Sequence, residues 1–77
     1  MPRFSPIKAV KLLKILRRLG FEEIRQKGSH LIVKHHDGRE TVIPVHKGEE
    51  IGRGLLRKIL RDINLSPEEF GKLKLTY

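Results

Sequence analysis

The chain contains no cysteine and few aromatic residues: three Phe, one Tyr and no Trp. Without cysteine, disulfides and thiolate metal sites are excluded, and the composition is compatible with a reducing cytosol. So few aromatics argue against a sheet that stacks single-stranded bases. No apolar stretch approaches the roughly 20 residues of a membrane helix, and the N-terminus has no apolar signal-peptide core. We therefore expect no membrane partner and a cytoplasmic location.

Several catalytic patterns are also absent. The sequence has no glycine-rich phosphate loop, no Ser-His-Asp spacing and no pair of carboxylates placed to share a cleft. Acidic residues are scarce, with 9 Asp and Glu against 17 Lys and Arg, for a net charge of +8 on 77 residues. Such a field attracts polyanions. An anionic membrane surface, an acidic protein and simple solubility remain alternatives, but basic stripes favour nucleic acid.

Helical periodicity predicts three helices in what we treat as a single domain, 1–77. The first has Ser5 as N-cap, Pro6 at its first position and Gly20 as a left-handed C-cap. A capping box from Ser66 to Glu69 begins the last and shortest one. The helices are predicted at 7–19, at about 53–63 and from Pro67 onward.

Between the helices, runs rich in β-branched residues predict three antiparallel strands. They are placed at 21–26, 30–36 and 39–46. Asp37-Gly38 predicts a tight hairpin turn in which both residues take positive φ, and Pro44 places the third strand at an edge or a bulge. The fold class is therefore α+β: a helix, three antiparallel strands and a helix, plus a short C-terminal helix. Two amphipathic helices would cover one sheet face and leave the other exposed or in contact with a partner.

All four histidines lie between 28 and 46, and His30 follows a Gly-Ser turn. An imidazole can act as acid or base near neutral pH, so His30 is a catalytic candidate; a surface histidine without a task is the alternative. His35 and His36 are adjacent in a strand and point to opposite faces, which disfavours a shared metal ion. We expect neither a metal nor a cofactor.

Basic residues recur along the first helix at Lys8, Lys11, Lys14 and Arg18, either as a solvated face or as phosphate contacts. Gly48, Gly52 and Gly54 surround the start of the second helix. They either let the loop turn or expose helix amides to a phosphate.

Several motifs stand in a specific order. They are Leu-Gly-Phe at 19–21, Arg-Gln-Lys-Gly-Ser-His at 25–30, His35 with Asp-Gly-Arg at 37–39, Val-Ile-Pro-Val-His at 42–46, Leu-Arg-Lys-Ile-Leu at 56–60 and Leu-Ser-Pro-Glu-Glu-Phe at 65–70. In this combination the chain resembles the HicA (YcfA-like) toxin family over nearly its whole length. The family usually has Gly-Thr-Leu-Arg at the second helix start, whereas this chain has Gly-Leu-Leu-Arg at 54–57. The missing hydroxyl weakens the case for a phosphate site there.

The resemblance implies a fold like the double-stranded-RNA-binding domain and the activity of an mRNA interferase held inactive by a HicB-type antitoxin. It also implies that His30, in Gly-Ser-His, is the functional histidine. The resulting hypothesis is a metal-independent endoribonuclease with His30 as general acid or base, Arg25 and Lys27 near the phosphate, and His46 as a second proton carrier. RNA contacts are assigned to Lys8, Lys11, Lys14, Arg18, Arg25, Lys27, Ser29, His46 and Arg57. The alternatives are a non-catalytic RNA-binding module and a protein-interaction subunit that uses the exposed sheet face.

Overall fold

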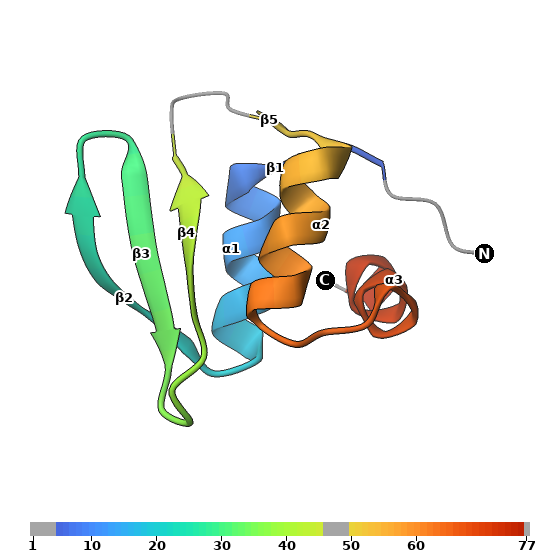
Figure 1. The fold of residues 1–77 in the computed structure, drawn as a ribbon. Helices are drawn as coiled ribbons and strands as arrows, with labels where there is room; N and C mark the ends of the chain where they lie inside the picture. Colours follow the sequence, from blue (N-terminus) through green and yellow to red (C-terminus); the bar gives the residue numbers. More distant parts are fainter. Residues whose placement is uncertain (1–4, 46–49, 77) are drawn as a thin grey trace.

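The computed structural model describes residues 5–45 and 50–76 (Figure 1). Its elements are β1 (Ile7–Lys8), α1 (Ala9–Arg18), β2 (Phe21–Lys27), β3 (His30–His35), β4 (Glu40–Pro44), β5 (Glu50–Ile51), α2 (Arg53–Asp62) and α3 (Pro67–Thr76). β2, β3 and β4 form an antiparallel sheet in that order. The predicted α+β class, with the order helix, three strands and helices, is confirmed, and the arrangement is consistent with the double-stranded-RNA-binding-domain-like fold.

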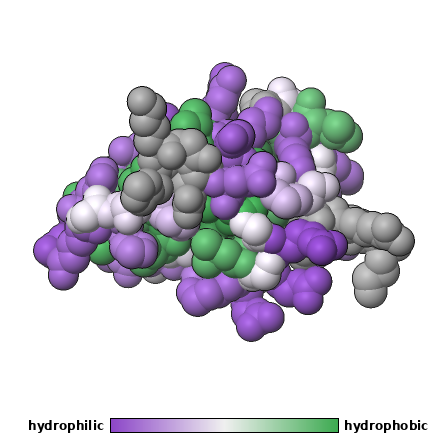
Figure 2. All heavy atoms as spheres, turned by 90° about the horizontal axis from the view of Figure 1, so that it is seen from above, coloured by the Kyte–Doolittle hydropathy of each residue, from purple (hydrophilic) through white to green (hydrophobic). Residues whose placement is uncertain are grey.

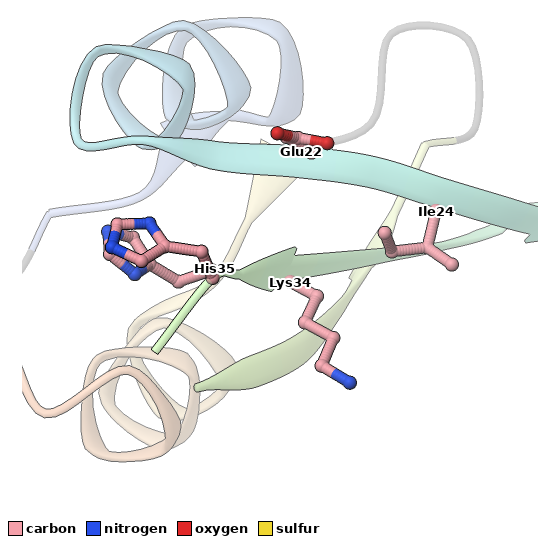
Figure 3. A pocket seen from close by; sticks show the side chains of 5 residues that line it. Glu22, Ile24, Lys34 and His35 are labelled. Atoms are coloured by element: carbon pink, nitrogen blue, oxygen red, sulfur yellow. The ribbon is translucent and has the colours of Figure 1, made fainter. Parts of the chain in front are cut away.

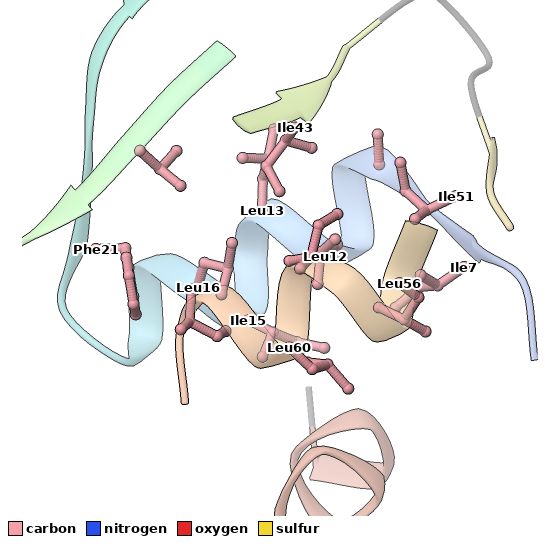
Figure 4. Packing of buried hydrophobic residues seen from close by; sticks show 14 of the residues in the cluster. Ile7, Leu12, Leu13, Ile15, Leu16, Phe21, Ile43, Ile51, Leu56 and Leu60 are labelled. Atoms are coloured by element: carbon pink, nitrogen blue, oxygen red, sulfur yellow. The ribbon is translucent and has the colours of Figure 1, made fainter. Parts of the chain in front are cut away.

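One face of the sheet packs against α1 and α2, and α3 lies on the far side of these helices (Figure 1). Side chains alternate along β3 and β4 because successive residues of a strand point to opposite faces. The inner, helix-facing side chains are buried: Leu31, Val33, His35, Thr41 and Ile43. Leu31, Val33 and Ile43 join helix residues such as Leu12, Leu16 and Leu56 in one hydrophobic core (Figure 4). Among the described residues no helix covers the outer face, in agreement with the sequence prediction.

The predicted start of the first helix is wrong. Ile7 and Lys8 form β1, which pairs with Ile51 and Glu50 of β5, and α1 begins only at Ala9. Lys8 is the N-cap and makes no side-chain capping hydrogen bond. Burial explains the difference, because strand pairing places the Ile7 side chain in the core, with 4% of its surface exposed. The partner strand lies more than 40 residues away in sequence, so local capping signals do not reveal it.

The two hairpins turn differently. Gly28 has a φ of +57° and opens a two-residue turn between the paired residues Lys27 and His30, as in a type II′ turn. At the second hairpin Gly38 has a φ of +101°, whereas Asp37 is not among the residues with positive φ, so that part of the turn prediction is wrong. The His35 amide donates to the Arg39 carbonyl at 2.8 Å, which closes a three-residue loop with glycine in the left-handed position. β3 consequently ends one residue earlier than predicted.

The C-terminal ends of α1 and α2 and the start of α3 follow the local sequence signals. Gly20 has a φ of +98° and its amide donates to the Arg17 carbonyl after α1, so the predicted C-cap is confirmed. Asn64 ends α2 in the same conformation, with a φ of 56°. The capping box of α3 is confirmed: the Glu69 amide donates to the Ser66 hydroxyl at 3.1 Å, and the Ser66 amide donates to the Glu69 carboxylate at 3.3 Å.

Within the described part of the chain, no helix combines the length and the apolar character that crossing a membrane requires.

Candidate functional site

His30 is the first residue of β3 and its side chain is exposed. It belongs to the outer face of the sheet, opposite the buried Leu31. Its cross-strand partners are Lys27 on β2 and Pro44 on β4. Among residues 5–45 and 50–76, none forms a hydrogen bond with the imidazole. Both ring nitrogens are therefore available to a ligand that reaches this face.

A β-bulge brings the two predicted phosphate-binding cations onto the face that carries His30. Strict alternation from the buried Phe21 would direct Arg25 and Lys27 toward the helices. The register of β2 shifts between Glu23 and Arg25, so that Arg25 pairs with Ile32 and Lys27 with His30. Ile32 and His30 belong to the outer face, and cross-strand partners have Cβ atoms roughly 4.5–5.5 Å apart. The bulge thus places two cations beside the histidine.

The other residues predicted to touch RNA are not gathered at His30. Lys11, Lys14 and Arg18 lie on α1, in the helical layer, and Lys8 lies just before it in β1; Lys8, Lys14 and Arg18 are exposed and Lys11 is half-buried. Arg57 is exposed on α2. Ser29 is half-buried in the turn, where its carbonyl accepts the Val45 amide at 2.7 Å. His46 lies outside the described residues.

The molecule presents a largely hydrophilic surface when it is seen from above (Figure 2). Apolar side chains show there as separate patches between hydrophilic ones. This view agrees with a chain in which charged residues make up 34% of the sequence and bases outnumber acids. A polyanion would therefore meet a positive field before it reached any particular side chain.

His35 is a structural residue, although it lies only five positions from His30. Its side chain is buried and its Nε2 lies 3.1 Å from the Leu19 carbonyl oxygen, while its Nδ1 accepts the Asp37 amide at 3.2 Å. Because a carbonyl can only accept, Nε2 carries the proton in this arrangement. The ring also meets Phe21 edge-on, with centroids 5.1 Å apart. His35 therefore joins the end of α1 to the second hairpin.

The Asp-Gly-Arg motif is structural as well. The Asp37 carboxylate accepts the Arg39 backbone amide at 3.0 Å and its Nε at 2.8 Å. Arg39 in turn donates to the Ile63 carbonyl at 2.7 Å, and its guanidinium lies 5.2 Å from the centre of the Phe21 ring. The motif connects the hairpin to the end of α2. The Arg39 amide, followed by its guanidinium, holds the pKa of Asp37 below its ordinary value.

A second carboxylate links the sheet to α2 and gives a prediction about acid stability. Asp62 accepts hydrogen bonds from the Lys58 ammonium at 3.0 Å and the Thr41 hydroxyl at 2.9 Å, and these lower its pKa. A carboxyl whose pKa is lowered by folding stabilises the fold above its unfolded-state pKa and loses that contribution as the pH falls through its folded-state pKa. We expect the free energy of unfolding to fall below about pH 4.

The variant that tests this prediction is Asp62→Asn. Its free energy of unfolding is measured with urea at neutral and at strongly acid pH. The variant should be less stable than the parent at neutral pH and should approach it in acid, where the parent carboxyl is protonated. Parallel stability curves for the two proteins would contradict this assignment.

An open hollow lies at the end of the outer face far from His30, where β3 runs into the second hairpin (Figure 3). Its volume is about 170 Å³ and it is lined by Glu22, Ile24, Lys34, His35 and His36. The sequence reasoning did not find it. Its members come from two strands and a turn, and only the register of β2 against β3 shows that they meet.

Metal binding finds no support in the geometry that the structure describes. Within residues 5–45 and 50–76, His, Asp and Glu side chains form no group of three that could hold an ion. His35 and His36 do not form a pair of ligands, because the His35 nitrogens are engaged with Leu19 and Asp37.

Comparison with known proteins gives one family. A family model described as the HicA toxin of bacterial toxin-antitoxin systems matches residues 10–65, which is well over half of the chain. The matched region extends from the start of α1 to the turn before α3 and includes His30, Lys27 and the Asp-Gly-Arg motif. A search of curated proteins finds no match.

Proposed function

The chain belongs to the HicA toxin family and is a toxin of a toxin-antitoxin system, with an antitoxin as its partner, and from this premise we propose that it is a metal-independent endoribonuclease acting on mRNA. The observation that carries the proposal is the outer sheet face, where His30 stands exposed beside Lys27. The antitoxin is proposed to be of the HicB type. Action on mRNA places the protein in the cytoplasm.

The chemistry follows from one imidazole and two cations. A ribose 2′-hydroxyl attacks the adjacent phosphorus, and the bond to the 5′-oxygen of the next nucleotide breaks. As a general base His30 takes the hydroxyl proton; as a general acid it gives a proton to the leaving 5′-oxygen. The products are a 2′,3′-cyclic phosphate and a 5′-hydroxyl. His46, two positions after the cross-strand partner of His30, is the proposed second proton carrier.

Lys27 and Arg25 act on the phosphate in this scheme. Negative charge develops on the non-bridging oxygens in the transition state, and fixed cations aimed at them lower the barrier. Lys11, Lys14, Arg18 and Arg57 belong to the helical layer, and Lys8 lies just before α1 in β1. They are proposed to contribute the field that attracts RNA and to contact backbone that extends beyond the sheet face.

The test of the function is incubation of the wild-type chain with a long RNA of mixed sequence in EDTA. Cleavage that leaves cyclic phosphate and 5′-hydroxyl ends supports the proposal. RNA binding that weakens as salt rises, without any cleavage, would instead favour the non-catalytic binding module. If the chain neither cleaves nor binds RNA, the remaining hypothesis is a protein-interaction subunit.

Lys27→Ala is expected to lower the cleavage rate by about tenfold or more, because it removes a cation from the phosphate site. It should also reduce the slope of log affinity against log salt by about one, the value for one lost phosphate contact. Lys72→Ala is the matched control, since it removes the same charge from an exposed position on α3. Equal effects of the two substitutions would show that Lys27 acts only through net charge.

A further inference from the structure

The hollow at the far end of the outer face takes no part in the cleavage chemistry proposed above. Glu22 and Lys34 stand directly opposite each other in the β2–β3 register and both are exposed. Neither forms an ion pair with another described residue. Figure 3 shows Glu22 and Lys34 on neighbouring strands with their side chains directed to opposite sides, Ile24 farther along β2, and the His35 ring at the end of β3. A carboxylate and an ammonium are thus left for a ligand.

The walls of the hollow suit an aromatic ring. Ile24 occupies the bulge position and is 53% exposed, so an apolar surface remains uncovered. The His36 ring stacks on the His35 ring, with centroids 4.3 Å apart and planes tilted by 32°. A ring that enters beside His36 would extend this stack. The volume, about 170 Å³, is comparable with that of an engineered cavity of about 150 Å³ that binds benzene.

We propose that this hollow binds an unstacked guanine base of the RNA substrate, so that it selects where the strand lies relative to His30. The proposal rests on the ribonuclease function and adds the base preference that the function alone does not supply. Single-stranded RNA is commonly recognised in this way, with splayed bases stacked on side chains and hydrogen-bonded along their edges.

Guanine is favoured by the hydrogen-bonding chemistry of the two charged groups. An ionised carboxylate only accepts, through two oxygens, and an ammonium only donates. Guanine offers two adjacent donors, N1–H and the N2 amino group, to the Glu22 carboxylate, and its O6 and N7 acceptors to Lys34. Adenine and cytosine present an amino donor next to a ring acceptor, and uracil presents one donor between two carbonyls. Those acceptors would face the carboxylate oxygens unfavourably.

The hollow and the cleavage site are close enough for one short RNA strand. Lys34 follows His30 by four residues on β3, a distance of roughly 13 Å along a strand. That span is at most about four base steps at the 3.4 Å rise of a stacked strand. Between the two sites lie Ile32, which is half-buried, and Val42, which is 42% exposed; both belong to the outer face. A nucleotide between the two sites would rest on this apolar strip.

The test measures binding of short uridine-rich RNAs that differ only in the central base, with His30→Ala as the parent so that the strands stay intact. We expect the guanine strand to bind at least about tenfold more tightly than the adenine, cytosine and uracil strands. An inosine strand, which lacks the 2-amino donor, should bind with intermediate affinity. Adding Glu22→Gln should remove most of the guanine preference and leave at most the part that Lys34 contributes. Adding His36→Ala should weaken all of them, by about fivefold or more.

Glu40→Gln is the matched control. Glu40 is exposed, flanks Lys34 from the other side in the β3–β4 register and does not line the hollow. Its substitution removes the same charge and should leave the guanine preference intact. Equal binding of all strands by the parent, or a guanine preference that Glu22→Gln leaves undiminished, would overturn the guanine site. Salt-sensitive binding without base preference would contradict the guanine site but not the ribonuclease function. No RNA binding at all would contradict both proposals.

Discussion

Replacing His30 with alanine is expected to reduce RNA cleavage in EDTA by at least about 100-fold, the lower range for loss of a general acid or base. The fold should persist, because the side chain is exposed and no other described residue depends on it for a hydrogen bond. RNA affinity should change little, since the neighbouring cations remain. Cleavage of a labelled RNA under single-turnover conditions gives the rate, and its binding gives the affinity.

Three readouts separate a proton-transfer role of His30 from a merely structural one. Added imidazole should restore part of the cleavage by His30→Ala. His30→Gln, which keeps a polar side chain but cannot exchange a proton near neutral pH, should be as inactive as the alanine variant. Glu40→Gln, on the same sheet face, should cleave like the wild type. Full cleavage by His30→Ala would assign the chemistry to another group, and His46→Ala would be the next variant.

The second large effect is expected at a different histidine. His35→Ala should lower the free energy of unfolding by about 2–4 kcal/mol, through a cavity in the core and a lost hydrogen bond. The Leu19 carbonyl and the Asp37 amide would lose their partner, and Phe21 would lose its edge-on contact. Small domains are stable by only about 5–15 kcal/mol, so this loss is a large fraction of the total. Urea unfolding at neutral pH measures it.

His30→Ala is the control for the stability measurement, because it makes the same chemical change on the surface. Its effect on the free energy of unfolding should stay within about 0.5 kcal/mol. Gly20 supplies a second check. A Cβ atom at this position would lie 3.0 Å from His35 Nε2, and its φ of +98° disfavours other residues, so Gly20→Ala should also destabilise the protein. A small effect of His35→Ala would mean that the ring is not part of the packed core.

The local sequence determined most of the elements. Apolar spacing predicted α1 and α2, because a helix that packs on a sheet must bury one stripe. Gly20 and the Ser66–Glu69 capping box marked helix ends, because these residues satisfy terminal backbone groups through local contacts. β-branched runs and glycines located the hairpins. The resemblance to HicA, carried by motifs such as Gly-Ser-His, led to the family that the match over 10–65 shows.

Other features were decided only by contacts between distant segments. Ile7 leaves the predicted helix because it gains burial against β5. Neighbouring histidines of the same chemistry separate into an exposed His30 and a buried His35, because strand alternation places them on opposite faces. Asp-Gly-Arg connects the second hairpin to α2 because Arg39 donates a hydrogen bond to the Ile63 carbonyl, and Ile63 lies 24 residues away in sequence.

The candidate site also depends partly on local sequence and partly on contacts between distant segments. The sequence by itself determined which residue types are present: a histidine after a tight turn, with Arg25 and Lys27 close by. Only the tertiary structure decided that these cations share a face with His30, because one bulge in β2 reverses the side-chain alternation. The same register brings Glu22 opposite Lys34 and forms the hollow. Pairing register depends on the energy of the whole sheet, so no local pattern could have supplied it.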